Sequence, residues 1–204
     1  EGNVPEAISQ GACGSCWANA AANTLTSRIN QKFGTKASNY VSRQQATSCT
    51  ENKLQCGGTG GCSGATAQLA FEHWANHGVV TEADYPYTSG SGSDGKCIEN
   101  SHNPTFSIDG FKDITPNDRQ ALLDVLKEGP VSVSAMASGW SFYSGGIYTK
   151  CDNVNVNHAI TLTGVGKTES GQYYYKIMNS WGKSWGENGE MRIQMAPPDQ
   201  EERC

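Results

Sequence analysis

The chain has 204 residues, a formal net charge of −5, and 36% hydrophobic and 17% charged residues, a composition that suits an ordinary globular domain with a substantial core. Its 15 basic residues form no cluster, which excludes nucleic acid as the main partner, because phosphate binding requires a basic face. No run of about 18 apolar residues occurs, so no segment is predicted to span a membrane.

Helices dominate the predicted N-terminal half. Apolar residues recur every four positions over residues 16–29, with alanines between them, which predicts a buried central helix. A second helix is expected over residues 64–77. A third is expected after Thr115, which we predict as its N-cap, with Pro116 in the first turn and residues 129–130 ending it.

The C-terminal half follows a different pattern. After residue 130 the hydrophobic period changes from about 3.6 residues to about 2. Segments that alternate or are rich in β-branched and aromatic residues, separated by glycine turns, predict antiparallel strands at 131–134, 158–165, 172–178 and 190–194. We therefore expect an α+β fold in one domain, residues 1–204, with a helical part over about 1–110 and a β-rich part over 111–204.

The most informative segment surrounds Cys16, which ends the run Gln10-Gly11-Ala12-Cys13-Gly14-Ser15-Cys16 and is followed by Trp17. This places one cysteine after a glycine turn, at the start of the predicted central helix. Free N–H groups and the positive end of the helix dipole favour a thiolate there, and the thiolate is the attacking form of cysteine. Cys16 is therefore the candidate nucleophile.

Two further motifs, around a histidine and an asparagine, lie downstream of Cys16. His158 lies in Val156-Asn157-His158-Ala159-Ile160, and Asn179 opens the Trp- and Gly-rich run over residues 179–189. In these three motifs, which span residues 10 to 189, the chain resembles the papain family of cysteine proteases. The resemblance implies a papain-like fold of two lobes, with the active-site cleft between a helical N-terminal lobe and an antiparallel β-rich C-terminal lobe.

The resemblance also assigns roles to four residues. Cys16 attacks a peptide carbonyl as a thiolate paired with the imidazolium of His158, and His158 protonates the leaving amine before a thioester acyl-enzyme is hydrolysed. Asn179 holds the imidazole in place as the third member of a Cys-His-Asn triad. Gln10 and the backbone N–H of Cys16 stabilise the oxyanion. The implied activity is that of a cysteine endopeptidase.

The substrate side is expected to be built from small residues. The resemblance places a glycine-rich segment on the main-chain-binding wall, and small side chains predict a roomy, moderately apolar pocket that accepts large aliphatic or aromatic groups. The predicted substrate-binding residues are Gly14, Ser15, Trp17, Ser63, Gly64, Ala65, Thr66, Ala67, Ser134, Val156, Asn157, Ala159 and Trp181.

The chain departs from the family pattern at several positions. Ala65 stands where a second glycine is usual, which is expected to alter the backbone approach slightly, and Asn19 stands where an aromatic residue is usual. Asn157 stands where aspartate is common, and the loss of that charge beside His158 is expected to shift the pH profile. The usual N-terminal Asp-Trp-Arg segment and the strand after the final cysteine are missing, which indicates either a fragment of the mature enzyme or a differently built pocket base. We favour a fragment. Insertions typical of the exopeptidase relatives are not found, which favours endopeptidase activity.

Eight cysteines indicate an oxidising compartment. The resemblance pairs Cys13 with Cys62, Cys49 with Cys97, and Cys151 with Cys204, and it leaves Cys56 over. The glycine-rich loop between Cys56 and Cys62 leaves open which of these two reaches Cys13.

Other interpretations were weighed against the protease. A catalytically silent relative that binds peptides or inhibitors is the main alternative, and the intact catalytic set argues against it. A redox pair formed by Cys13 and Cys16 leaves His158 and Asn179 without a role. Zinc binding by Cys13, Cys16, Cys56 and Cys62 lacks a second C-x-x-C pair. The histidines outside the motifs, which are His73, His77 and His102, are interpreted as surface or helix-face residues.

These assignments set the expected partners and location. We expect no cofactor and no metal, and a monomer that acts on peptide or protein substrates without binding nucleic acid or a membrane. Made as a zymogen, it would also bind its own pro-segment and cystatin-like inhibitors. The expected location is lysosomal or vacuolar, or else secreted and extracellular.

Overall fold

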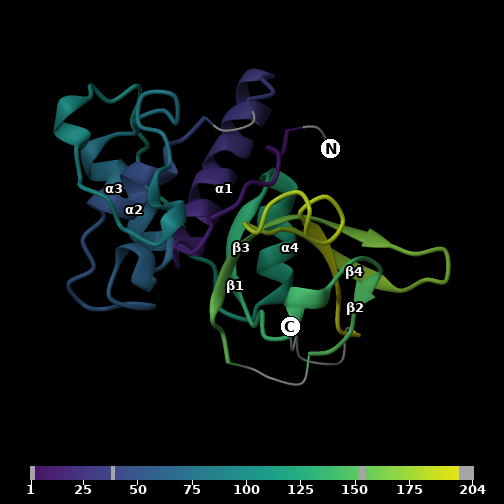
Figure 1. Cartoon of the computed structure of the whole chain (residues 1–204). Coiled ribbons are helices and arrows are strands. Elements are labelled where there is room, and N and C mark those ends of the chain that lie inside the picture. The colour runs from purple at the N-terminus through teal and green to yellow at the C-terminus, as the bar shows by residue number, and fades with distance from the viewer. Residues whose placement is uncertain (1–2, 38–39, 152–154, 198–204) are drawn as a thin grey trace.

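A computed structural model describes residues 3–37, 40–151 and 155–197. Three helices lie on one side of the molecule, and a five-stranded sheet with a fourth helix lies on the other (Figure 1). We call these the helical side and the sheet side. The helices are α1 (Cys16–Phe33), α2 (Arg43–Cys49), α3 (Ala67–His77) and α4 (Arg119–Glu128), and α4 packs on the sheet side.

Helix α1 is the central element, as the sequence predicts. Alanines at positions 18, 20, 21 and 22 are almost completely buried, because small side chains let neighbouring elements approach the helix closely. The helix runs four residues beyond its predicted end and stops at Gly34, which adopts the left-handed conformation with φ 66°.

Contacts of α1 reach both sides of the molecule. Toward the helical side, Trp17 packs with Trp74 of α3 in one hydrophobic cluster. Toward the sheet, Thr24 Oγ1 and Ser132 Oγ lie 2.8 Å apart, and Thr161 Oγ1 donates to the carbonyl of Ala20 at 3.2 Å. Apolar packing on one face and hydrogen bonds on the other therefore fix the position of this helix.

The sheet has the strand order β1-β3-β4-β5-β2. Neighbouring strands in this order are antiparallel, except for β2 and β5, which are parallel to each other. The prediction missed β2, because a strand of two residues carries no readable alternation. The strands are β1 (Val131–Ala135), β2 (Ile147–Tyr148), β3 (His158–Lys167), β4 (Tyr173–Met178) and β5 (Glu190–Gln194).

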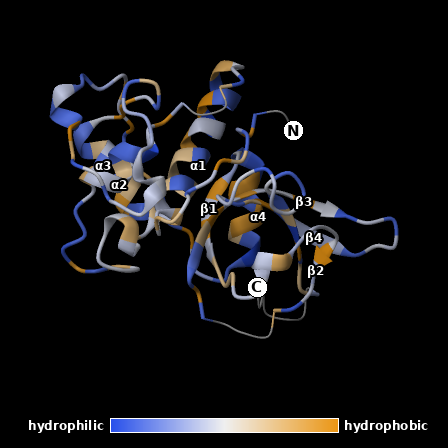
Figure 2. Ribbon diagram, in the orientation of Figure 1, coloured by the Kyte–Doolittle hydropathy of each residue, from blue (hydrophilic) through white to orange (hydrophobic). Residues whose placement is uncertain are grey.

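A second hydrophobic cluster fills the sheet side. Trp140, Leu162, Ile177 and Met191 are completely or almost completely buried in it. Leucines of α4 pack against this cluster, and Figure 2 shows hydrophobic segments on α4 and on the neighbouring strands. Separate clusters on the two sides agree with the predicted α+β arrangement. The division of the chain near residue 110 stays a prediction.

The helix boundaries show where local signals were misread. Helix α3 begins three residues later than predicted, because Gly64 has φ 90° and Thr66 is extended, and neither conformation is helical. Thr115 was wrongly predicted as the N-cap of α4. Instead Asn117 adopts a left-handed conformation with φ 58°, and the side chain of Asp118 accepts a hydrogen bond from the N–H of Ala121 at 3.0 Å. The short, polar helix α2 was missed, because it has no apolar period.

The segment before α1 crosses to the sheet side. Ser9 and Trp181 form an isolated antiparallel bridge, and the N–H of Gln10 donates to the carbonyl of Ser180 at 2.8 Å. This pairing brings the residues that precede Cys16 against the loop that follows β4. Among the described helices, none is long and apolar enough to cross a membrane.

The position of the α4 cap gives a direct test. Asp118→Ala removes the side chain that accepts from Ala121, so it is expected to lower the free energy of unfolding by about 1 kcal/mol. Thr115→Ala is the matched control, since Thr115 is equally exposed and its side chain caps nothing in the described structure. Urea unfolding followed by circular dichroism measures both changes, and equal losses would contradict the assignment.

Candidate active site

Cys16 occupies the first position of α1, and its side chain is partly buried. Three backbone N–H groups, those of Ala159, Trp17 and Cys16 itself, lie close enough to the thiol to lower its pKa. Burial raises the pKa of the Cys16 thiol above its ordinary value, and the three N–H groups oppose this rise without cancelling it. The N–H of Ala159 comes from β3, so the cysteine lies against the start of that strand.

His158 precedes Ala159 and is 8% exposed. Its Nε2 lies 2.7 Å from Oδ1 of Asn179, and this oxygen also accepts from the N–H of Ser180 at 2.8 Å. Since an amide oxygen only accepts, Nε2 carries a proton, and Nδ1 is the ring nitrogen left to gain or lose the second one. Burial lowers the pKa of His158, and the hydrogen bond to Asn179 acts in the opposite direction.

Tryptophan rings surround the histidine. The ring of Trp181 lies 5.2 Å from that of His158, and the ring of Trp140 meets it edge-on at 6.2 Å. Asn179 is 1% exposed, and its Nδ2 has no hydrogen-bond partner among the described residues. These rings limit the access of water to the hydrogen bond between His158 and Asn179.

The side-chain amide of Gln10 is held at both ends. Its Nε2 donates to the carbonyl of Cys13 at 2.8 Å, and its Oε1 accepts from the hydroxyl of Ser180 at 2.5 Å. An amide nitrogen carries two protons, so the second N–H of Gln10 remains without a partner among the described residues. The sequence did not single out Ser180, although it lies next to Asn179 in the quoted motif.

A glycine-rich loop packs against the cysteine segment. Gly14 donates its N–H to the carbonyl of Cys62 at 2.9 Å, and a Cβ at Gly14 would lie only 2.4 Å from that oxygen. Only glycine fits this approach. The contact brings the predicted wall residues Ser63, Gly64, Ala65, Thr66 and Ala67, all at least partly exposed, beside the cysteine segment.

Predicted binding residues on the sheet side also lie together. Ser134 pairs with Ala159 in the register of β1 and β3. The side chain of Asn157 folds back onto the loop after β1, where its Oδ1 accepts from the N–H of Ala137 at 2.9 Å. Val156 is 62% exposed.

Two of the predicted binding residues are enclosed. Ser15 and Trp17 are 0% exposed, and the indole N–H of Trp17 donates to the carbonyl of Gly61 at 3.1 Å. Because neither residue is exposed, both support the site by packing and neither faces solvent. Whether the remaining set contacts a substrate stays a prediction.

The disulfides remove two of the alternative interpretations. Cys13 bonds to Cys62 and Cys49 to Cys97, as predicted, while Cys16 and the exposed Cys56 are free thiols. A redox pair of Cys13 with Cys16 and a zinc site that uses Cys13 and Cys62 are therefore excluded. The predicted bond from Cys151 to Cys204 involves a residue outside the described ranges.

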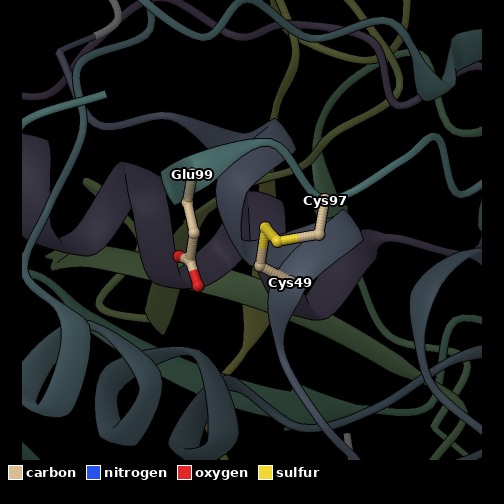
Figure 3. A group of neighbouring side chains, drawn as sticks. All are labelled: Cys49, Cys97 and Glu99. Atoms are coloured by element: carbon tan, nitrogen blue, oxygen red, sulfur yellow. A yellow bond between two sulfur atoms is a disulfide. The ribbon is translucent and has the colours of Figure 1, made fainter. Parts of the chain in front are cut away.

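Three side chains, those of Cys49, Cys97 and Glu99, lie as close together as metal ligands do, but they do not form a metal site. Glu99 lies beside Cys49 and Cys97, and the two sulfur atoms are bonded to each other (Figure 3). Sulfur in a disulfide does not provide the thiolate ligand that a metal needs. Glu99 instead lies 2.7 Å from Nε2 of His73, so of the two predicted places for this histidine, surface or helix face, it takes a buried face of α3 with 7% exposure.

Comparison with known proteins agrees with this geometry. The family model described as papain family cysteine protease matches residues 1–203. A senescence-specific cysteine protease of Arabidopsis thaliana is 38% identical over 208 residues, which cover 100% of this chain and 57% of that protein. Cathepsin J of Rattus norvegicus is 38% identical over 201 residues, covering 95% of this chain and 58% of that protein.

Solved structures share the fold. Bromelain from Ananas comosus, in complex with an inhibitor, has a TM-score of 0.85 at 29% identity, covering 97% of this chain and 87% of that chain. Digestive procathepsin L 3 of Tenebrio molitor has a TM-score of 0.81 at 29% identity, covering 95% of this chain and 62% of that chain. The chain spans just over half the length of the first curated relatives. The family match over nearly all its residues, with the α+β architecture, shows that the chain belongs to the papain family of cysteine proteases.

Proposed function

We propose that this protein is a cysteine endopeptidase that hydrolyses peptide bonds with Cys16 as the nucleophile. One observation carries the proposal. The N–H of Ala159, the residue directly after His158, lies close enough to the Cys16 thiol to lower its pKa, and His158 is itself held by Asn179 at 2.7 Å. A nucleophile, a base and the group that orients the base therefore meet at the junction of α1 and β3.

The ionisation states of Cys16 and His158 depend on one another. Burial raises the pKa of Cys16 and lowers that of His158, so it disfavours a thiolate alone and an imidazolium alone. A thiolate beside an imidazolium offsets both costs, because opposite charges at short range stabilise each other strongly in a buried site. The helix N-terminus and the three N–H groups favour the negative charge further. The proposed resting state is this ion pair.

The reaction then follows from the proton positions. The thiolate attacks the peptide carbonyl, a carbon–sulfur bond forms, and the carbonyl electrons move to oxygen. His158 gives its proton to the departing amine as the carbon–nitrogen bond breaks, which leaves a thioester. His158 next takes a proton from water, the hydroxide attacks the thioester, and the thiolate leaves. Asn179 keeps the ring oriented through both steps.

The negative oxygen needs donors that are in place before the reaction. The free N–H of Gln10 and the backbone N–H of Cys16 are the proposed pair. Support for Gln10 comes from its fixed amide, which is bonded to Cys13 through nitrogen and to Ser180 through oxygen. A donor held in this way pays little reorganisation energy when charge develops.

The proposed substrates and partners follow from the predicted walls of the site. Small, partly exposed residues from the glycine-rich loop and from Ser134 and Val156 suit a peptide with a large aliphatic or aromatic side chain. The similar structures include a procathepsin and a bromelain–inhibitor complex, which supports binding of a pro-segment and of active-site inhibitors. Two disulfides support a lysosomal, vacuolar or extracellular location.

The identity of the nucleophile is tested with an epoxide thiol inhibitor at acidic pH. We expect one modification, mapped to Cys16 by peptide mass spectrometry, together with loss of peptidase activity. Cys16→Ala is expected to abolish turnover, and Cys56→Ala, the matched control at the other described free thiol, to retain it. A folded protein that is neither labelled nor active would instead identify a catalytically silent relative.

The ion pair is tested by titration of His158. In Cys16→Ser the pKa of His158 is expected to fall below its ordinary value, because burial disfavours the imidazolium and no thiolate compensates. In the parent protein the pKa is expected to be higher. Histidine ring signals in NMR measure both values. Equal values for His158 would refute the pair.

The role of Gln10 is tested by removing its amide. Gln10→Ala is expected to lower kcat by about 10²- to 10³-fold with little change in KM, because the lost donor acts mainly in the transition state. Steady-state hydrolysis of a fluorogenic peptide gives both constants, and thermal melting checks that the variant is folded. A folded variant with unchanged kcat would show that Gln10 is not an oxyanion donor.

A further inference from the structure

The hydroxyl of Tyr87 joins the two chain segments that carry the proposed oxyanion donors. It lies 2.9 Å from the carbonyl oxygen of Gln10 and 2.7 Å from Oγ of Ser15. Gln10 supplies the side-chain donor, and Ser15 directly precedes Cys16, which supplies the backbone donor. Tyr87 itself belongs to neither segment and lies more than 70 residues away in the chain.

The proton in each of these hydrogen bonds has a defined direction. A carbonyl oxygen only accepts, so the single proton of the Tyr87 hydroxyl points to Gln10. Ser15 must then donate its own proton to Tyr87. Ser15 Oγ in turn accepts from Nδ2 of Asn19 at 3.1 Å. Burial raises the pKa of the Tyr87 phenol above its ordinary value, so the phenol keeps the proton that it donates.

A buried ion pair extends and closes this chain of hydrogen bonds. Arg43, which is 8% exposed, donates to Oδ1 of Asn19 at 3.2 Å and to Glu82 at 2.9 Å. Its guanidinium stacks over the Tyr87 ring at 4.4 Å. Glu82 also accepts from the N–H of Tyr87 at 3.1 Å, so the sequence of contacts returns to its starting residue.

The side chain of Asn19 links two members of this closed series of contacts. The family usually has an aromatic residue at this position, whose side chain could not bond to Ser15 and Arg43 together. In this chain the Asn19 amide uses both of its ends, nitrogen toward Ser15 and oxygen toward Arg43. A polar link therefore fastens the start of α1 to α2.

We propose that Tyr87 is a positioning residue for the oxyanion hole, whose hydroxyl sets the distance between Gln10 and the first turn of α1, with Asn19 and Arg43 holding its partners. The inference rests on the endopeptidase function proposed above. Donors stabilise a developing charge only when held within about half an ångström of the productive geometry, so a support that fixes both segments acts on the transition state.

Tyr87→Phe and Tyr85→Phe provide a matched comparison. Both tyrosines flank Pro86, and each donates its hydroxyl to a backbone carbonyl, that of Lys96 in the case of Tyr85. Tyr87→Phe is expected to lower kcat about tenfold with KM changed less than about twofold, a fraction of the loss from removing a donor outright. Tyr85→Phe is expected to keep kcat within about twofold of the parent while losing a comparable amount of thermal stability.

Two inhibitors separate an effect on the oxyanion from general damage. A peptide aldehyde forms a tetrahedral adduct whose oxygen occupies the oxyanion hole, so its affinity should fall about tenfold in Tyr87→Phe. Alkylation by iodoacetamide involves no such oxygen, so its rate at Cys16, read by peptide mapping, should stay at the parent value.

The outcomes distinguish this inference from the function on which it rests. An inactive parent protein would overturn the endopeptidase. An active parent in which both phenylalanine variants lose kcat equally, or in which Tyr87→Phe raises only KM, would overturn the positioning role alone. A parallel fall in aldehyde affinity and alkylation rate would also overturn it, because Tyr87 would then act on the thiol.

Discussion

The contact between the start of α1 and the start of β3 is the constraint on which the proposed chemistry depends. Cys16 belongs to the helix and His158 to the strand, and the N–H of Ala159, next to His158, lies close to the sulfur. Packing on one face of α1 and hydrogen bonds to Ser132 and Thr161 on the other hold the helix in this position. Cys16 and His158 are therefore positioned by packing across the whole molecule rather than by a single loop.

Burial at this junction has opposing effects. It makes each isolated charge unfavourable, and it also keeps water from weakening the attraction between a thiolate and an imidazolium. The tryptophans around His158 and the fixed amide of Gln10 belong to the same arrangement, in which polar groups are oriented before the substrate arrives. Such preorganisation is the usual source of electrostatic catalysis.

The sequence predicts the elements that carry a strong period or a local motif. Helix α1, strands β1, β3, β4 and β5, and the pairing of Cys13 with Cys62 all agree with it. What it could not predict depends on contacts between distant segments. The bond from Ser180 to Gln10, the burial of His73 against Glu99, and the ring through Arg43 and Tyr87 leave no periodic signal, because their partners lie far apart in the chain.

The position of α1 also affects how the protein loses its structure. Residues of α1 belong to the first hydrophobic cluster, and Thr24 and Ala20 bind strands β1 and β3 on the other side. Because α1 is held from both sides, hydrogen exchange of its buried amides should require a larger opening than fraying of the helix ends.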